Sequence, residues 1–229
     1  MLGLQLQGID MRFPGLAAPA LAIDSLSIPA GSRVALTGAS GSGKSTLISI
    51  LTGLERVGQG RILWGDVDIC TLSEGGRDRW RGANIGLVLQ NFHLFPGLSA
   101  FENVLLPARL SGAMARDIRA RAQDLLLRVG LARPTQMIET MSRGEMQRVA
   151  IARALLRRPG VVIADEPTAS LDSDAGDAVG DLLIELSRAS GCTLVVATHD
   201  PALTRRLDRR IRLVAGRIVE DGVIGERAA

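Results

Sequence analysis

The chain has 229 residues, of which 46% are hydrophobic, 22% are charged and 3% are aromatic. This much apolar material excludes a disordered or fibrous chain and suffices for one large domain or two small ones. The formal charge is only +3, without a long run of like charge, and aromatic side chains that could stack on bases are scarce, so we expect no nucleic-acid partner.

Segments with the character of strands alternate with helical segments in the first ninety residues. The expected strands are residues 2–6, 21–28, 33–37, 61–64 and 85–89. The strand at 33–37 runs into a glycine-rich loop, and residues 45–53 are expected to form the helix after it. The polar, arginine-rich stretch between residues 64 and 85 is assigned no helix or strand.

The middle of the chain changes character, because two helical segments follow one another without a strand between them. Ser99 and Glu102 have the spacing of a capping box, which opens a helix through residue 109. A second helix is expected over residues 114–129, with Gly130 as its stop. This stretch predicts a helical subdomain inserted in an α/β core.

The alternation of helices and strands then resumes. Ser142 and Glu145 form another capping box, which opens a helix through residue 157. The segments expected after it are strands at 161–164 and 193–197, a helix at 174–190 between them, a short helix at 201–207 and a hairpin of residues 212–214 and 217–219. The strand at 161–164 is wholly apolar, as is typical of strands buried on both faces of a parallel sheet, and the strand at 193–197 is also expected to be buried. The apolar runs are far shorter than the ~20 residues that span a bilayer, so we expect no direct membrane insertion.

The strongest motif is residues 38–45, GASGSGKS, which fit the P-loop pattern G-x-x-x-x-G-K-[ST] between a strand and a helix. In such a loop, backbone N–H groups point at phosphate oxygens beside the positive end of the following helix. Lys44, the only lysine among the 27 basic residues, would reach the β- and γ-phosphates, and the Ser45 hydroxyl would bind Mg²⁺. The expected nucleotide-binding residues are Gly38, Ser40, Gly41, Ser42, Gly43, Lys44, Ser45 and Thr46.

Two adjacent acids, Asp165 and Glu166, follow the expected strand at 161–164. A P-loop alone is found in kinases, GTPases, motor ATPases and transport ATPases, and these acids narrow the choice. Asp165 can anchor Mg²⁺, directly or through water, and Glu166 can polarise a water for in-line attack on the γ-phosphate. A turn or a helix cap is the alternative interpretation of an isolated acid pair.

With these motifs, the sequence resembles the nucleotide-binding subunit of an ABC transporter over about residues 2–222. Gln90 matches the Q-loop of that family, whose glutamine contacts Mg²⁺ and senses the membrane partner. Asp172 lies in a segment similar to the D-loop, and His199 matches the switch histidine. Phe13 lies about where the family places an aromatic ring that stacks on adenine, with a core phenylalanine as the alternative.

The resemblance implies the fold, which is α/β. It is a P-loop NTPase core with a mixed sheet, an N-terminal antiparallel β part and an inserted α-helical subdomain. We expect a single domain in which residues 1–90 and 160–222 form the core and its β part, and about 91–158 form the helical subdomain with the signature motif.

Residues 141–148, MSRGEMQR, resemble the family signature usually written LSGGQ. Ser142 caps a helix whose free N–H groups, with Gly144, make a second anion site that has no phosphate of its own. The resemblance implies a head-to-tail homodimer, in which Ser142, Gly144 and Glu145 of one chain close on ATP held by Lys44 of the other. The sequence departs from the family pattern at Arg143, where glycine is usual, and at Glu145, where glutamine is commoner.

The resemblance also implies a mechanism and a cellular setting. The chain would hydrolyse ATP with Mg²⁺, with Glu166 positioning the water and His199 contacting the γ-phosphate across the dimer, near Asp172. The dimer would drive transmembrane permease subunits, separate chains that hold it in the cytoplasm against the inner face of the membrane. Residues 86–109, GLVLQNFHLFPGLSAFENVLLPAR, resemble the lipoprotein-releasing and macrolide-export branch, which extracts or exports its substrates.

Three alternatives stay open at this point. One is a cell-division ATPase of the same branch, which regulates a membrane partner and transports nothing. A second is the ATPase of an importer, although the short C-terminal part of the chain does not favour the sugar importers, which carry an extra domain. A third is a DNA-repair ABC ATPase, for whose coiled coil or zinc module the residues between Lys44 and Ser142 leave no room.

Overall fold

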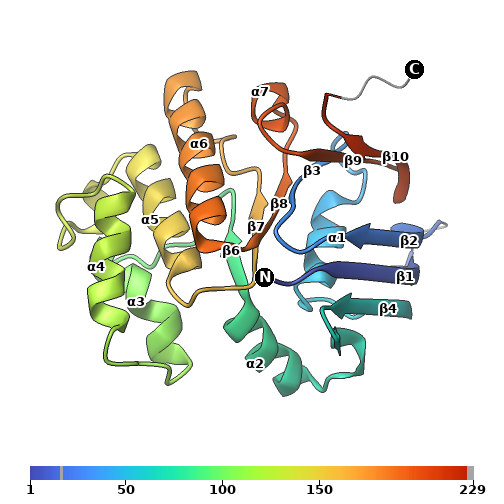
Figure 1. Ribbon diagram of the computed structural model, residues 1–229, viewed down its shortest axis with the longest axis horizontal. Coiled ribbons are helices and arrows are strands. Elements are labelled where there is room, and N and C mark those ends of the chain that lie inside the picture. The colour runs from blue at the N-terminus through green and yellow to red at the C-terminus, as the bar shows by residue number, and fades with distance from the viewer. Residues whose placement is uncertain (16–17, 226–229) are drawn as a thin grey trace.

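The computed structural model describes residues 1–15 and 18–225 and arranges their strands in two sheets (Figure 1). The first is antiparallel, in the order β2 (Leu21–Ile28), β1 (Leu4–Met11), β4 (Gln59–Trp64) and β5 (Val67–Asp68). The second has the order β10 (Arg217–Val223), β9 (Arg209–Val214), β3 (Arg33–Thr37), β8 (Thr193–Ala197), β7 (Val161–Asp165) and β6 (Ile85–Val88). Its strands pair in parallel except β10, which is antiparallel to β9. The predicted fold class is confirmed.

The helices cover the second sheet on both faces. They are α1 (Lys44–Leu51), α2 (Glu74–Asn84), α3 (Ala100–Leu110), α4 (Ile118–Arg128), α5 (Arg143–Leu155), α6 (Ser173–Ser190) and α7 (Pro201–Thr204), with single 3₁₀ turns at Ile69–Thr71 and Ile138–Thr140. Helix α1 lies between the two sheets, and α3, α4 and α5 gather at the opposite end of the molecule (Figure 1). The described residues include no helix that is both long and apolar enough to cross a bilayer.

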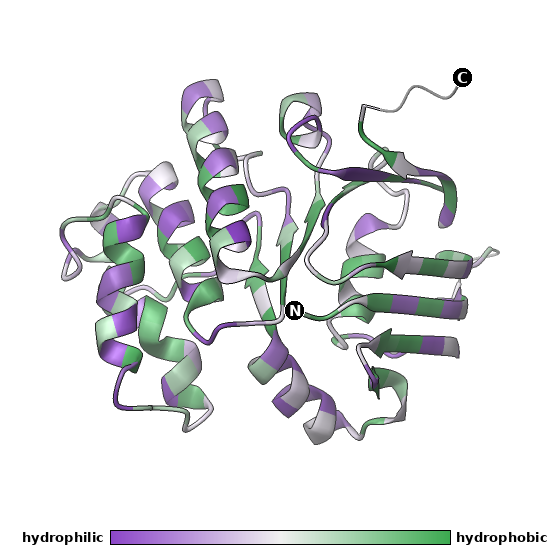
Figure 2. Cartoon of the chain, in the orientation of Figure 1, coloured by the Kyte–Doolittle hydropathy of each residue, from purple (hydrophilic) through white to green (hydrophobic). Residues whose placement is uncertain are grey.

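Two hydrophobic cores meet at the central strands. Along β7, Val162 and Ala164 point into the core shared with α3–α6, whereas Val161 and Ile163 point into the core shared with α1 and the antiparallel sheet. Because side chains alternate across a strand, an all-apolar strand can serve both cores at once. Figure 2 shows hydrophobic residues on the central strands and both hydrophobic and hydrophilic residues on helices such as α4, α5 and α6.

Both predicted capping boxes are present. Ser99 caps α3 and Ser142 caps α5, each accepting a hydrogen bond from the backbone of the glutamate three residues later, which reaches back to the backbone of the serine. The strands β2, β3 and β8 have the predicted bounds, and α6 ends at Ser190, where Gly191 takes a left-handed conformation.

Some predicted elements were wrong in extent or were missed. Helix α2 lies in the arginine-rich stretch in which no helix was predicted. Its only buried side chain is Arg77, so it lacks the apolar stripe by which an amphipathic helix is recognised. Helix α4 begins at Ile118 instead of residue 114, since Gly112 at φ 66° turns the chain and Asp117 pairs with Arg158. Helix α7 ends at Thr204, three residues early, and β9 and β10 are longer than predicted.

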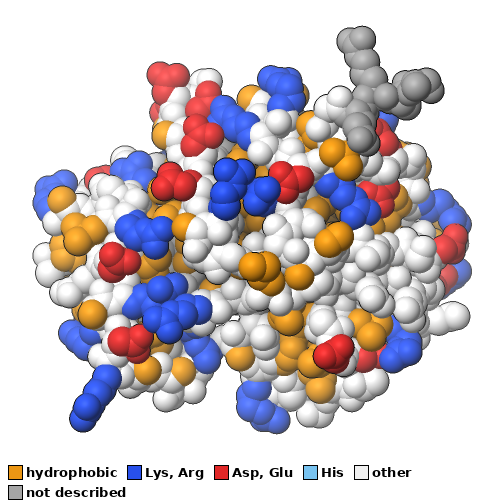
Figure 3. Space-filling model, in the orientation of Figure 1, with side chains coloured by type: hydrophobic (Ala, Val, Ile, Leu, Met, Phe, Trp, Pro, Cys, Tyr) orange, Lys and Arg blue, Asp and Glu red, His pale blue; other side chains and the backbone are white. Residues whose placement is uncertain are grey.

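Positive and negative side chains are interspersed over the face shown in Figure 3. Several arginines of residues 205–212 form ion pairs. Arg206 lies 2.5 Å from Asp177, Arg209 lies 2.5 Å from Asp221, and Arg210 pairs with Glu220. Each pair joins exposed or half-exposed side chains, so its contribution to stability is small.

Close packing of α5 on β6 brings the signature helix against the central sheet. A Cβ atom on Gly86 in β6 would overlap the carbonyl oxygen of Ala154 in α5, and backbone cannot move aside as a flexible side chain can. The missing side chain at residue 86 therefore sets the distance between this helix and the sheet.

We predict that Gly86→Ala lowers the free energy of unfolding by about 1–3 kcal/mol, the usual cost of overpacking a core. Gly222→Ala is the matched control, because a Cβ atom there meets nothing within 4 Å. Urea unfolding of both variants measures the difference. Equal stabilities would show that α5 can shift away from β6 at little cost.

Candidate functional site

The P-loop connects the end of β3 to the start of α1. Gly43 takes a left-handed conformation at φ 105° and is the N-cap of α1, so the N–H groups of the first turn point into the loop. The Lys44 Nζ atom donates hydrogen bonds to the carbonyl oxygens of Gly38, at 2.7 Å, and Ala39, at 3.2 Å. The loop thus curls around its own lysine and presents backbone donors and a cation at one spot.

A cavity of about 990 Å³ opens above this loop and brings together nearly all the residues for which nucleotide contact is predicted. Its predicted lining residues are Phe13, Gly38, Ser40, Gly41, Gly43, Lys44, Ser45, Thr46, Gln90, Asp165, Glu166 and His199. Ser42 differs, because its side chain is buried beneath the loop and does not line the cavity. The Ser42 carbonyl accepts a hydrogen bond from the N–H of Gly216 at 2.9 Å, so this residue supports the loop from below.

Three of the predicted site residues line the cavity from the ends of two neighbouring parallel strands. Asp165 is the last residue of β7, Glu166 follows it, and His199 lies two residues after β8. The Glu166 backbone is left-handed, at φ 46°, and its N–H donates to the carbonyl of Ala197 at 2.8 Å. This bend directs the Glu166 carboxylate to His199, whose Nδ1 lies 2.9 Å from Oε2.

The electrostatics of the cavity favour added positive charge. Burial raises the pKa of the Asp165 carboxyl group, and the neighbouring Glu166 carboxylate raises it further. Lys44 and the Ser45 hydroxyl act in the opposite direction without cancelling the rise. Two carboxylates side by side with one lysine therefore make an environment in which a cation and a phosphate group would complement each other.

The far end of the cavity is less polar. Phe13 is 37% exposed and lines the cavity together with Pro19, Ala20 and the turn of Ala215 and Gly216 between β9 and β10. This turn was predicted as part of a hairpin but not as part of the site. The one available signal was Gly216, since a Cβ atom on it would lie 2.5 Å from the carbonyl oxygen of Ala20.

The signature residues lie elsewhere. Ser142, Arg143, Gly144 and Glu145 form the N-terminus of α5, and none of them lines the cavity that contains Lys44. The Glu145 Oε2 atom accepts a hydrogen bond from the Ser142 N–H at 2.8 Å, and this bond is the main reason that the pKa of Glu145 is lowered. Asp172 is also outside the cavity, where its carboxylate caps α6 by accepting from the Ala175 N–H at 2.9 Å.

Arg143, at the position where the LSGGQ pattern has glycine, contacts two other segments of its own chain. Its Nε donates to the carbonyl of Ser170 at 2.9 Å, and its guanidinium carbon lies 5.4 Å from the centre of the Phe92 ring. The second distance is within the range of a cation–π interaction. Arg143 therefore joins the start of α5 to the segments that follow Gln90 and precede Asp172.

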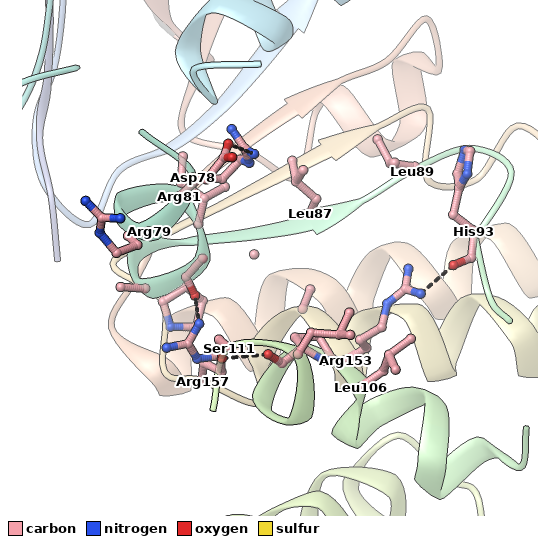
Figure 4. A pocket seen from close by; sticks show the side chains of 18 of the residues that line it. Asp78, Arg79, Arg81, Leu87, Leu89, His93, Leu106, Ser111, Arg153 and Arg157 are labelled. Carbon is pink, nitrogen blue, oxygen red and sulfur yellow. Dashed lines mark hydrogen bonds and ion pairs between the residues drawn. The ribbon is translucent and has the colours of Figure 1, made fainter. Parts of the chain in front are cut away.

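A second cavity, of about 940 Å³, was not predicted at all. It is a groove between α2, β6, α3 and α5 (Figure 4). Its apolar lining includes Leu87, Leu89, Phe95, Leu106 and Leu110, and its charged lining is Asp78, Arg79, Arg81, Arg153 and Arg157. Phe95 is 53% exposed and Leu110 is 78% exposed. The groove thus combines exposed apolar side chains with an excess of positive charge.

The raised pKa of Asp165 gives a prediction for the protein without nucleotide or Mg²⁺. A carboxyl group whose pKa is higher in the folded state than in the unfolded state destabilises the fold once it ionises. Asp165→Asn should therefore raise the midpoint of thermal unfolding at pH 7.5, by about 2–4 °C, and the gain should shrink towards pH 4 as the wild-type carboxyl group becomes protonated. Calorimetry at both pH values measures this, and a gain that grows on acidification would contradict it.

Comparison with known proteins agrees with this geometry. The family model described as ABC transporter matches residues 21–169. An ABC transporter ATP-binding protein of Mycobacterium tuberculosis is 45% identical over 190 residues, covering 82% of this chain and 77% of the relative. The lipoprotein-releasing system ATP-binding protein LolD of Anaeromyxobacter dehalogenans is 44% identical over 209 residues, covering 90% of this chain and 87% of the relative.

The solved structures agree as well. The ATP-binding cassette MJ0796, in a dimeric post-hydrolysis state bound to ADP and Pi, superposes with a TM-score of 0.87 at 33% sequence identity, covering 98% of this chain and 100% of that one. With the matching family model and relatives above 40% identity, this likeness extends to sequence as well as fold. The chain belongs to the ABC transporter family, as one of its ATP-binding, ATP-hydrolysing subunits.

Proposed function

We propose that the chain binds Mg²⁺ and ATP in the cavity around Lys44, dimerises head to tail on ATP, and drives a separate membrane permease of the extracting or exporting type. The observation that carries the proposal is the division of the predicted residues. Lys44, Asp165, Glu166 and His199 share one cavity, whereas the signature residues at the start of α5 lie outside it. A complete site then needs the signature of a second copy.

Within one chain, each side chain has a separate task. The loop N–H groups and Lys44 bind the β- and γ-phosphates, and Phe13 stacks on adenine. Glu166 orients the attacking water, and the hydrogen bond at 2.9 Å between Glu166 and His199 fixes the direction of the carboxylate in the cavity that would bind the phosphates. Catalysis of this type depends on positioning and on charge stabilisation.

Magnesium suits the donors that border the cavity. Mg²⁺ prefers oxygen ligands, and Ser45, Asp165 and Gln90, whose side chains all carry an oxygen atom, line the same cavity. Without a metal, the pKa of the Asp165 carboxyl group is raised, and a bound cation would lower it by stabilising the carboxylate. When bound with ATP, Mg²⁺ would neutralise charge that develops on the phosphates.

Dimerisation would use the N-terminus of α5. This end carries the partial positive charge of a 13-residue helix, the N–H of Gly144 and the Arg143 guanidinium. Such an end stabilises an anion without supplying a lysine. The dimeric MJ0796 structure supports this arrangement, in which each copy would bring its signature to ATP bound by the other.

Glu166→Gln should trap the dimer. The amide keeps the size of the side chain but cannot act as a base, so ATP hydrolysis should fall by about 10²–10⁴-fold while ATP binding remains. Size-exclusion chromatography with ATP should show a dimer of this variant, and without ATP a monomer. Wild-type turnover in Glu166→Gln would overturn the role of the glutamate.

Ser142 variants in the Glu166→Gln background then test the second copy. Asp and Asn both serve as N-caps, so both variants should preserve α5. Ser142→Asp places a negative charge towards the phosphate and should abolish the ATP-dependent dimer, whereas Ser142→Asn should retain it. An Asp variant that dimerises as well as the Asn variant would show that residue 142 does not face ATP.

The groove of Figure 4 is the proposed contact with the permease. It is lined from the core by α2 and β6 and from the helical part by α3 and α5, so a partner segment seated in it would touch both parts. We propose that residues 91–158 move as one subdomain against the core when this contact shifts. The partner would hold the chain at the cytoplasmic face of the membrane, and the likeness to LolD supports extraction or export.

Leu110→Asp should disrupt this contact, because it puts a charge on an exposed apolar side chain of the groove. The matched control is Leu127→Asp on α4, whose side chain is 66% exposed and lies outside the groove. We expect only Leu110→Asp to lose its membrane partner when a tagged chain is purified from detergent-solubilised membranes, with basal ATP hydrolysis unchanged in both. Loss of the partner in both variants, or in neither, would place the permease contact elsewhere.

A further inference from the structure

The two residues that follow the Gln90–Asn91 step are held in an unfavourable backbone conformation. Phe92 has φ 57° and His93 has φ 46°, and both lie in the left-handed region that residues other than glycine rarely adopt. Phe92 is also buried, at 7% exposure, although it lies in a loop. A segment of this kind needs contacts from outside to keep its shape.

Two arginines of α5 supply such contacts. Arg153 donates from its two terminal nitrogens to the carbonyl oxygens of Phe92, at 2.6 Å, and His93, at 2.5 Å. Figure 4 shows the Arg153 side chain reaching from α5 to the backbone of His93. From the other end of the helix, Arg143 stacks on the Phe92 ring and donates to the carbonyl of Ser170.

The position of Arg153 is unusual in a second respect. Its side chain lines the groove proposed for the permease, whereas Gln90, two residues before the first carbonyl that it binds, lines the nucleotide cavity. Desolvation lowers the pKa of this guanidinium, as is expected where a charged group is taken out of water to bind carbonyl oxygens. Arg153 thus lines the groove and binds the chain two residues after a side chain that lines the nucleotide cavity.

We propose that Arg143 and Arg153 are positioning residues, which fix the strained segment after Gln90 onto α5 and so set the place of Gln90 in the nucleotide cavity. We call these two arginines the clamp. Because Ser142 caps the start of α5, the clamp makes the signature and the Gln90 segment move together. A partner that enters the groove would contact Arg153 and could shift both at once. This inference rests on the proposed role of Gln90.

The planar guanidinium is essential to the proposal, since it binds two consecutive carbonyl groups at the same time. Arg153→Lys keeps the charge but has a single nitrogen on a shorter side chain, in place of the two terminal nitrogens that each bind one carbonyl. We expect it to lower kcat for ATP by about tenfold with KM for ATP nearly unchanged, because the P-loop is untouched. Rescue is tested with His93→Gly, which removes the strain at φ 46° but keeps the Phe92 ring on which Arg143 stacks, and which should make Arg153→Lys less harmful only if the arginine acts on this segment.

Arg121→Lys is the matched control. Arg121 also donates to two consecutive carbonyls, those of Leu156 at 2.8 Å and Leu155 at 3.0 Å, but it holds the C-terminal end of α5 and touches neither cavity. Its replacement should lower thermal stability as much as Arg153→Lys does and leave kcat unchanged. An equal loss of kcat in both variants would overturn the proposal in favour of a merely structural role.

A double-mutant cycle with Gln90→Ala separates this inference from the function on which it rests. If the clamp acts through Gln90, Arg153→Lys should have no further effect on kcat in the Gln90→Ala background. Full additivity of the two changes would overturn the clamp and leave the role of Gln90 intact. If Gln90→Ala alone leaves kcat unchanged, the proposed role of Gln90 fails first.

Discussion

Burial of the central parallel strands on both faces is the constraint that places the functional groups. The alternate side chains of β3, β7 and β8 enter two different cores, so helices must cover both sides of the sheet. Helix α1 fills one side, and its N-terminus then lies at the edge where the parallel strands end. Lys44, Asp165 and His199 meet there because each lies at or shortly after the carboxyl end of one of these parallel strands.

The same edge collects features that are unfavourable by themselves. Glu166 is left-handed, which costs on the order of 1–3 kcal/mol, and Asp165 carries a carboxylate beside another carboxylate in a half-buried place. The Glu166 backbone is held by the hydrogen bond that its N–H donates to the carbonyl of Ala197 in β8, and an added cation would compensate the charge of the two carboxylates. The packed strands supply the stability that allows such groups to persist, and the ligand supplies the partner that they lack.

What could be predicted from the sequence depends on how local the signal is. The P-loop, the two capping boxes and the acid pair after β7 involve residues within a few positions of one another, and the structure has each element where its motif lies. Helix α2 could not be recognised, because it buries little besides Arg77 and contains Gly75 and Gly76 in its first turn. The roles of the individual site residues stay predictions, since geometry places them together without showing a reaction.

The groove and the clamp were beyond sequence analysis for a different reason. The groove is lined by residues from Asp78 to Pro159, which the packing of α2, α3 and α5 around β6 brings together, including the close contact of α5 with Gly86. Arg153 and the carbonyls that it binds are about sixty positions apart in the chain. Every residue has a backbone carbonyl, so the sequence does not indicate which carbonyls Arg153 binds. The left-handed conformation of Phe92 and His93 falls on residue types that do not favour it, so it could not be predicted either.

The contrast between lysine and arginine in this chain follows from the arrangement of the acceptors. Where two consecutive carbonyls face one side, as for Arg153 and Arg121, a planar fork can bind both. In the P-loop, a single nitrogen donates to the carbonyls of both Gly38 and Ala39, and phosphate oxygens would approach the same nitrogen from a third direction. An ammonium group with three tetrahedral donors fits that arrangement and a flat guanidinium does not. A chain that otherwise uses arginine for its cations therefore has its one lysine at the point where acceptors surround the charge.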